Sequence, residues 1–279
     1  MKNNGRTLKK TITGVLTAML VLACLTACGK KEDAGKTEDA GKTAADTPAV
    51  TITVAAAASL KNAFENDLIP AFNNKYPNIK IAGTYDSSGK LQTQIEEGLD
   101  ADIFFSAAMK QMNALNDGGR IESSTINKLL ENKIVLITGT EQNVDFKEFT
   151  DILKADSIAV GDPESVPAGQ YAKEAYTTLG IWDQISAKAS LGTNVTEVLS
   201  WVAEGSAQAG VVYATDAASQ PKVKVIAEAP EGSLEKPVIY PVAMVKNSTH
   251  PEEAKKLLDF LAGEEAAKIF EKYGFTVNN

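Results

Sequence analysis

The stretch at residues 161–172, GDPESVPAGQYA, combines residue types that let a backbone hold an anion. Pro167 suits the first position of a helix, because proline lacks the N–H group that would have no partner there. Ala168 and Gly169 follow with small side chains, and the dipole of a helix N-terminus attracts negative charge. The same letters also fit an ordinary strand-to-helix turn without a ligand. The rest of the chain must decide between these two interpretations.

Four more residues lie at comparable places in the predicted elements. Ser59, Ser88 and Val195 each lie at a predicted turn from a strand into a helix, and Tyr213 ends an apolar run typical of a buried strand. In open α/β sheets, ligands collect beyond the carboxyl ends of the strands, where these residues should meet. Together with Ala168 they offer hydroxyl groups and backbone N–H groups, all of them neutral donors. Each helix N-terminus carries roughly half a positive charge, so four of them suit a tetrahedral dianion without any Lys or Arg.

Other kinds of site find less support in the sequence. A hydrolase would need Ser59 or Ser88 beside a base, but the one histidine of the chain is His250, in a sequence typical of an exposed helix start. A site for a metal cation would want clustered His or Cys, and no cysteine follows Cys28. A sensor domain would need an attached signalling module, which this sequence does not show. We therefore expect a binding protein with no catalytic residue, no metal cation and no cofactor.

The elements that must position these residues alternate between strands and helices. A first series has predicted strands at 51–58, 78–84, 101–106 and 133–138, with helices at 60–75, 88–98 and 107–117. A second series has strands at 157–160, 209–213 and 238–245, helices that start near 167 and 194, and two closing helices. Such alternation predicts mainly parallel sheets flanked by helices. The expected N-caps are Ser59, Ser88 and Asn194, the last with Glu197 in a near capping box.

Two such α/β units, joined by chain crossings near Thr138 and Val238, predict a two-lobed clamp with two crossover strands as its hinge. The expected division is lobe I at 50–138 and 238–279, and lobe II at 139–237. Of the 279 residues 44% are apolar, which is enough for a sizeable core.

The first segment is expected to target the chain rather than to fold. Basic residues up to Lys10 precede an uncharged apolar run at 11–27, which is typical of a signal peptide and slightly short for a membrane span. The letters LTAC at 25–28 resemble the lipobox of bacterial lipoproteins. Residues 1–27 are therefore predicted to be a lipoprotein signal peptide and Cys28 the lipidated residue, with Cys24 a looser match.

Residues 28–49 are predicted to be a flexible, lipid-anchored linker, since EDAGKT occurs there twice in tandem. The leader holds four of the 28 basic side chains and none of the 36 acidic ones. Its removal would take the net charge from −8 to −12, and nucleic acid is not an expected partner of such a surface.

Motifs from residue 51 onward resemble, in order, those of the substrate-binding proteins of bacterial molybdate ABC transporters. They are AAASL at 56–60, SSGKLQTQIEEG at 87–98, ADIFFSA at 101–107, GDPESVPAGQYAKEA at 161–175, GVVYATDA at 210–217 and YGFT at 273–276. The resemblance implies a type II periplasmic-binding-protein fold that captures molybdate or tungstate between its lobes and delivers it to a membrane permease. The oxyanion ligands that it implies are Ser59, Ser88, Ala168, Val195 and Tyr213.

The resemblance also implies an extracytoplasmic monomer, anchored to the membrane by its lipid. Another tetrahedral oxyanion such as sulfate is the alternative ligand, and an enzyme on the same fold is a more distant alternative. Asp86 would repel a dianion, so we expect its carboxylate to point away; if it does not, a protonated oxyanion such as phosphate would suit it. Lys61 and Lys90 lie in the first turns of two of the helices, and we expect neither to bind the anion directly.

Overall fold

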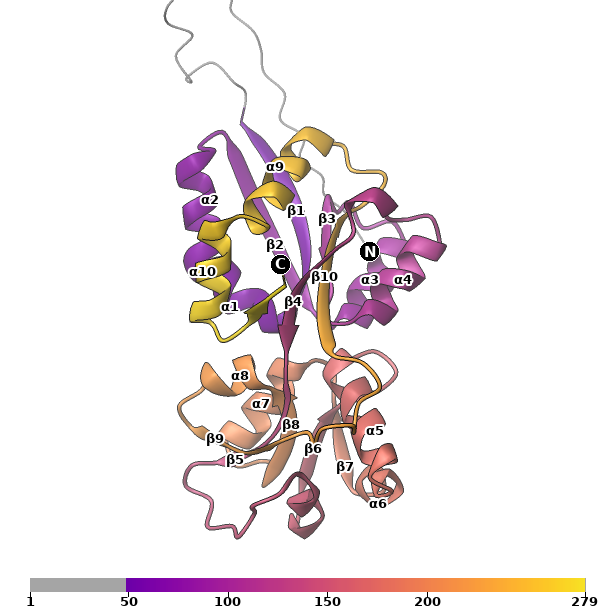
Figure 1. Cartoon of the computed structure of the whole chain (residues 1–279), viewed down its shortest axis with the longest axis vertical. Coiled ribbons are helices and arrows are strands. Elements are labelled where there is room, and N and C mark those ends of the chain that lie inside the picture. The colour runs from indigo at the N-terminus through magenta and orange to yellow at the C-terminus, as the bar shows by residue number, and fades with distance from the viewer. Residues whose placement is uncertain (1–48, 279) are drawn as a thin grey trace, which may run out of the picture. The chain divides into compact units, whose positions relative to one another are not determined.

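The first lobe of the protein is built on a six-stranded sheet (Figure 1). The computed structural model describes residues 49–278. The strands of this sheet are β1 (Val50–Ala57), β2 (Ile79–Asp86), β3 (Ile103–Phe105), β4 (Asn127–Asn132), β10 (Val238–Met244) and β11 (Thr276–Val277). Their order across the sheet is β11-β4-β10-β3-β1-β2.

The second lobe is built on a five-stranded sheet. Its strands are β5 (Ile134–Gly139), β6 (Ile158–Gly161), β7 (Ala189–Gly192), β8 (Ala209–Tyr213) and β9 (Val223–Glu228). Their order is β7-β6-β8-β5-β9. Strands β6 and β8 are buried along their whole length, as expected for apolar runs at the centre of a sheet.

Both sheets follow one plan, and both are mixed rather than mainly parallel. In each, a central strand, β1 or β6, pairs in parallel with two neighbours. A strand that arrives from the other lobe, β10 or β5, then joins in antiparallel orientation. The prediction of mainly parallel sheets is wrong on this point, because a crossover strand enters the new lobe against the direction of the strands already there.

The chain leaves the first sheet at Lys133, between β4 and β5. This differs from the expected boundary at Thr138, because β5 pairs with β8 and β9 of the second lobe. The apolar pattern of β5 shows that it is buried, but pattern alone does not show in which sheet. The chain returns where β10 begins, and the register of β10 shifts at Pro241, which has no N–H group to donate.

A continuous helical run at 58–75 follows β1, close to the predicted helix. It consists of a 3₁₀ turn η1 (Ala58–Leu60), α1 (Lys61–Ala63), a π-helical segment η2 (Phe64–Leu68) and α2 (Ile69–Lys75). In the π-helical segment the N–H group of Ile69 bonds to the carbonyl of Phe64, five residues earlier. Pro70 explains this shift, because it has no N–H group and its ring clashes with a regular helical carbonyl.

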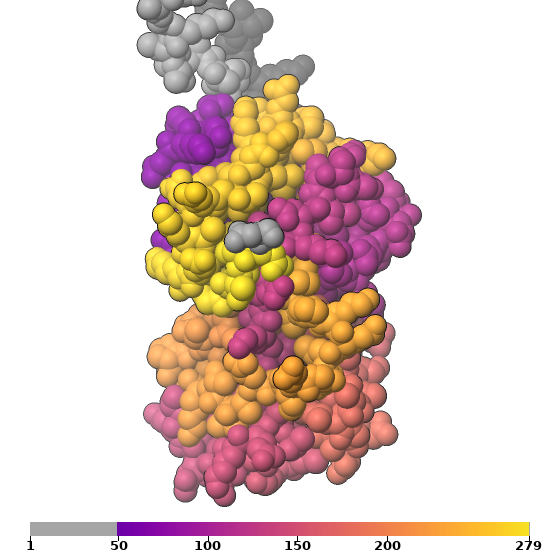
Figure 2. Space-filling model, in the orientation of Figure 1, coloured from indigo at the N-terminus to yellow at the C-terminus, as the bar shows by residue number. Residues whose placement is uncertain are grey.

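Within the described residues, eight further α-helices flank the two sheets, besides the 3₁₀ segments η3 (Ser123–Thr125) and η4 (Phe149–Lys154). On the first lobe they are α3 (Ser88–Glu96), α4 (Met109–Asp117), α9 (Pro251–Leu261) and α10 (Glu264–Lys272), and on the second α5 (Pro167–Thr178), α6 (Trp182–Ser186), α7 (Val195–Ala203) and α8 (Ala214–Ala218). The yellow C-terminal helices lie beside the indigo start of the folded chain, so the last residues complete the first lobe (Figure 2).

Two of the expected N-caps are wrong and one is confirmed. Ser59 lies inside the turn η1, whose N-cap position is Ala57. Ser87 rather than Ser88 caps α3, accepting the N–H group of Lys90 at 3.4 Å. Asn194 caps α7 as expected, accepting the N–H group of Glu197 at 3.0 Å.

No helix within residues 49–278 is long and apolar enough to cross a membrane. The predicted signal peptide, both candidate cysteines and the linker up to residue 48 lie outside the described residues.

Candidate anion-binding site

The five predicted ligand residues line one small cavity, which holds about 200 Å³ of empty space counting the part open to solvent. Ser59 and Ser88 come from the first lobe, and Ala168, Val195 and Tyr213 from the second. The other residues in its wall are Ala57, Ala58, Asp86, Ser87, Ala107, Val166 and Pro167. The structure therefore brings together residues spread over more than 150 positions of sequence.

Ser88 is held so that its hydroxyl hydrogen is free. It is the first residue of α3 and is fully buried. Its Oγ accepts the N–H group of Ala107 at 2.9 Å. Because the oxygen already accepts a hydrogen bond from the protein, its own O–H group can donate into the cavity.

Ser59 is oriented by a residue that the sequence reasoning missed, Tyr240. The Oγ of Ser59 lies 2.9 Å from the hydroxyl of Tyr240, and the amide of Asn132 donates to that hydroxyl at 3.4 Å. A tyrosine oxygen that accepts from Asn132 can donate its hydrogen to Ser59, which leaves the hydrogen of Ser59 for a ligand. The only signal in the sequence is a tyrosine next to a proline within a predicted strand.

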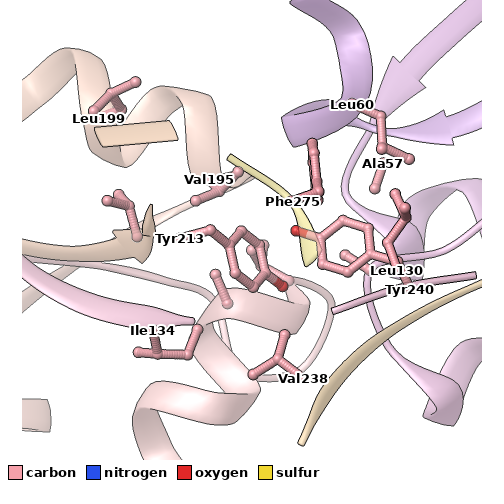
Figure 3. Close-up of a cluster of buried hydrophobic side chains, with 14 of the residues drawn as sticks. Ala57, Leu60, Leu130, Ile134, Val195, Leu199, Tyr213, Val238, Tyr240 and Phe275 are labelled. Atoms are coloured by element: carbon pink, nitrogen blue, oxygen red, sulfur yellow. The ribbon is translucent and has the colours of Figure 1, made fainter. Parts of the chain in front are cut away.

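Tyr213 supplies a buried hydroxyl with no partner. The residue is 1% exposed, and no hydrogen bond of good geometry reaches its hydroxyl within residues 49–278, although the hydroxyl of Tyr240 lies nearby. Burial raises the pKa of this phenol well above its ordinary value, so it stays a neutral donor. Figure 3 shows the rings of Tyr213 and Tyr240 turned toward each other, with centroids 5.4 Å apart at an angle of 67°.

Ala168 and Val195 offer backbone N–H groups. They are the second and first residues of α5 and α7, so neither N–H group has a carbonyl four residues earlier in its own helix. Both residues are buried, at 0% and 4% exposure. A buried N–H group without a helical partner is suited to an oxyanion.

The start of α5 is placed by Gly169. A Cβ atom added there would lie 1.9 Å from the carbonyl oxygen of Gly161, at the end of β6. Pro167 occupies the first turn of the helix, as expected. The absence of a side chain on Gly169 therefore lets α5 begin close against its strand, which puts Ala168 in the wall of the cavity.

The turn before α5 is organised by Asp162. Its Oδ1 accepts the N–H group of Glu164 at 3.0 Å, and its Oδ2 accepts the hydroxyl of Ser165 at 3.3 Å. Its carbonyl accepts the N–H group of Val166 at 2.7 Å. These bonds explain why the segment GDPESV carries an aspartate, because they fix the path of the chain into the helix.

Asp86 is among the residues that line the cavity, and its carboxylate has partners within the protein. Its Oδ1 accepts the N–H group of Ser87 at 2.8 Å and the amide of Asn194 at 3.4 Å, and it pairs with Lys90 Nζ at 3.4 Å. The carboxylate charge is thus engaged by these three donors of the protein. Neither Lys61 nor Lys90 is among the residues that line the cavity.

A second carboxylate, Asp216, lies behind the site and was not singled out from the sequence. Its side chain is 6% exposed, and its Oδ2 has no partner among the described residues. Burial raises its pKa to about 7, and the N–H group of Tyr213 opposes that shift. Asp216, Ser59 and Lys61 line a neighbouring cavity.

Other candidate chemistry lies elsewhere or is not found in the described part of the chain. A larger hollow lies at the end of the second lobe, between Gly139, Gln142, Gly205 and Lys222, and none of the five predicted residues lines it. No group of three or more His, Cys, Asp or Glu side chains within residues 49–278 could hold a metal ion. The Nδ1 atom of His250 lies 3.5 Å from Asp102 Oδ1, at the start of α9.

Comparisons with known proteins show which family the chain resembles. Residues 52–276 match the family model of bacterial extracellular solute-binding proteins. The chain is 41% identical over 227 residues to YvgL of Bacillus subtilis, named as a candidate ABC transporter substrate-binding lipoprotein, with 81% of this chain and 86% of that protein covered. It is 40% identical over 232 residues to the molybdate-binding protein ModA of Escherichia coli, with 81% and 89% covered.

A solved structure shows the same fold. The periplasmic molybdate-binding protein of Azotobacter vinelandii superposes with a TM-score of 0.72 at 22% identity, over 82% of this chain and all of the other. That likeness confirms the predicted two-lobed periplasmic-binding-protein architecture. The chain belongs to the bacterial extracellular solute-binding protein family, among the relatives of the molybdate-binding proteins.

Proposed function

We propose that this protein captures molybdate, and also tungstate, in the cavity between its lobes and delivers it to the permease of an ABC transporter. The observation that carries the proposal is the convergence of neutral donors from both lobes on one cavity. The hydroxyl of Tyr213 has no partner among the described residues. A buried donor left unpaired costs about 1–3 kcal/mol, which an oxyanion in the cavity would recover.

Charge on the anion would be balanced without a salt bridge. The helical elements that begin at Ala58, Ser88, Pro167 and Val195 all start at the cavity wall. At roughly half a positive charge each, such N-termini offset about two negative charges. The ligands would be the hydroxyls of Ser59, Ser88 and Tyr213 and the N–H groups of Ala168 and Val195. The E. coli relative is named for molybdate, which supports this choice of anion.

The protein would bind its ligand without chemical change and without a cofactor. In the structure, Ser59 bonds to the hydroxyl of Tyr240, and Ser88 to the N–H group of Ala107. Neither partner is a base that could activate a serine. An assay with chromogenic ester substrates should therefore show no turnover that depends on either serine.

The protein would act outside the cytoplasm as a monomer, held at the membrane by a lipid on Cys28. The Bacillus relative is named as a lipoprotein, which supports the anchor. Stable anchoring takes two or more acyl chains, which bacterial lipoprotein processing would supply. Mass spectrometry should find a lipidated N-terminal Cys28; a mature N-terminus at Cys24 would correct the site, and an unmodified one would refute the anchor.

A different tetrahedral oxyanion is the competing assignment. A carboxylate of Asp86 turned toward the cavity would favour a protonated anion such as phosphate, while sulfate is a smaller dianion. Calorimetric titration with molybdate, tungstate, sulfate and phosphate decides between them. We expect tight 1:1 binding of the first two and far weaker binding of the others, which cannot reach all five donors at once. Comparable affinity for sulfate or phosphate would overturn the assignment.

A further inference from the structure

Within residues 49–278, three hydrogen bonds join α3, α4 and Asp86 of the first lobe to the second lobe, besides the bond from Asn132 to Thr215 near the crossover. The N–H group of Gly89 donates to the carbonyl of Ser165 at 2.9 Å. The amide of Asn194 donates to Asp86 at 3.4 Å, and the amide of Gln111 donates to Gln170 Oε1 at 3.2 Å. Each pairs a first-lobe residue with a second-lobe residue, so each exists only while the lobes are together.

The contact between Gly89 and Ser165 leaves no room for a side chain. A Cβ atom added to Gly89 would lie 2.3 Å from the carbonyl oxygen of Ser165, 2.7 Å from its Cα and 2.9 Å from its carbonyl carbon. All three are backbone atoms, so no change of rotamer relieves the clash. Ser165 is held by the turn that Asp162 organises, and its N–H group also bonds to the carbonyl of that residue at 3.1 Å.

The contact with the other lobe accounts for a glycine at this position. Gly89 is the second residue of α3, and its φ is not among the positive values that favour glycine. In helices, alanine is more favourable than glycine because glycine loses more backbone freedom on folding. The three atoms nearest to the added Cβ all belong to Ser165, on the other lobe. Glycine at position 89 thus disfavours α3 locally and permits close approach of the lobes.

We propose that the Gly89–Ser165 contact is the latch of the closed clamp, and that Gly89 sets anion affinity as a positioning residue that does not bind the anion. This inference rests on the proposed function. With the latch formed, the second-lobe donors reach an anion that the first-lobe hydroxyls already hold. An alanine at position 89 keeps all five donors but holds the lobes apart, so the anion bonds to only one set at a time.

The test compares three full-length proteins: wild type, Gly89→Ala and Gly263→Ala. Gly263 is a matched control, a first-lobe glycine at the start of α10 with negative φ, whose nearest atoms beyond its own neighbours, from Phe260 and Asp259, lie in the same lobe. Calorimetry with molybdate should show affinity at least tenfold weaker for Gly89→Ala and within twofold of wild type for Gly263→Ala. The melting temperature of anion-free Gly89→Ala should equal or exceed that of wild type, because the substitution favours α3.

Solution scattering measures the radius of gyration, which should not change if Gly89 only stabilises its own helix. With saturating molybdate, Gly89→Ala should keep a larger radius of gyration than wild type. A second variant, Gln170→Ala, removes another interlobe bond without a clash and should weaken binding only a few-fold. If wild type binds molybdate and Gly89→Ala shows the same affinity and the same compaction, the proposed latch is wrong but the proposed function stands. Failure of the wild type to bind molybdate would overturn the proposed function, and the latch with it.

Discussion

The two lobes share one topology but supply the anion with different chemical groups. The turn after the central strand carries Ser59 in the first lobe and Ala168 in the second. The helix after the next strand begins at Ser88 in the first lobe and at Val195 in the second. At these two places the first lobe offers side-chain hydroxyls and the second offers backbone N–H groups. The fold therefore fixes where donors stand, and the sequence at each turn decides which kind of donor it is.

The other parallel neighbour of each central strand, β3 in the first lobe and β8 in the second, shows the difference more clearly. After β3, the N–H group of Ala107 is used inside the first lobe to hold Ser88. At the end of β8, the hydroxyl of Tyr213 has no partner in the described residues, nor has Oδ2 of Asp216 three positions later. At the end of β3 the polar group is thus paired within its own lobe, while at the end of β8 two polar atoms have no partner among the described residues.

The largest effect should come from removing the carboxylate of Asp216, which is buried in the second lobe with one oxygen unpaired among the described residues. The pKa of Asp216 is raised from 3.8 to about 7, so the folded protein binds its proton more tightly than the unfolded chain. The tighter proton binding adds to the free energy of unfolding; this added stability is fully present below pH 3.8 and is lost as the pH rises to about 7. It amounts to on the order of 4 kcal/mol.

Asp216→Asn should therefore gain stability over wild type as the pH rises from 5 to 8. Denaturant unfolding at pH 5, 6, 7 and 8 measures the free energy of unfolding of each protein. Taking the difference between the two proteins cancels the titration of all other groups. A difference that does not change with pH would show that Asp216 is already ionised at pH 5 in the fold.

The next largest effect separates Tyr213 from Ser88. Tyr213→Phe removes one hydrogen bond to a charged oxygen, which contributes about 1.5–3 kcal/mol, or roughly 10- to 150-fold in molybdate affinity. Its hydroxyl has no partner in residues 49–278, so the anion-free variant should be at least as stable as wild type. Ser88→Ala should weaken binding similarly but also lower stability, because the N–H group of Ala107 loses its acceptor. Equal stability losses in both variants would contradict the contrast between the lobes.

A smaller effect is expected at Tyr240, which acts through Ser59. Tyr240→Phe leaves every proposed ligand in place but removes the group that orients the Ser59 hydroxyl. A neutral hydrogen bond contributes about 0.5–1.5 kcal/mol, so affinity should fall by roughly 2- to 12-fold. The double variant with Ser59→Ala should be no worse than Ser59→Ala alone, as calorimetry can show. Fully additive losses would mean that Tyr240 does not act through Ser59.

The smallest effect should come from neutralising the lysines. Lys90 pairs with Asp86, and Lys61 lines the neighbouring cavity. Lys61→Gln and Lys90→Gln should change affinity by well under tenfold, through a long-range field that salt screens. Titrations at low and high ionic strength measure this. If either lysine variant loses binding while Tyr213→Phe keeps wild-type affinity, the site is not made of neutral donors.

Much of the fold and the candidate site follows from local sequence signals. Pro167 and Asn194 mark real helix starts, and AGVVY marks a buried strand, because such signals act within a few residues. The crossing at Lys133, the mixed sheets and the roles of Tyr240 and Asp86 could not be predicted. They depend on which strand lies beside which and on contacts between residues far apart in the chain, and no local pattern encodes these.

The central claim is that neutral donors from both lobes hold a dianion together. A crystal of the protein with tungstate tests it most directly, because tungsten gives strong anomalous scattering that locates the anion. We predict one peak in the cavity, with oxygens at hydrogen-bond distance from Ser59 Oγ, Ser88 Oγ, Tyr213 Oη and the N–H groups of Ala168 and Val195. An anion bound directly to Lys61 or Lys90, or bound by one lobe alone, would contradict the account.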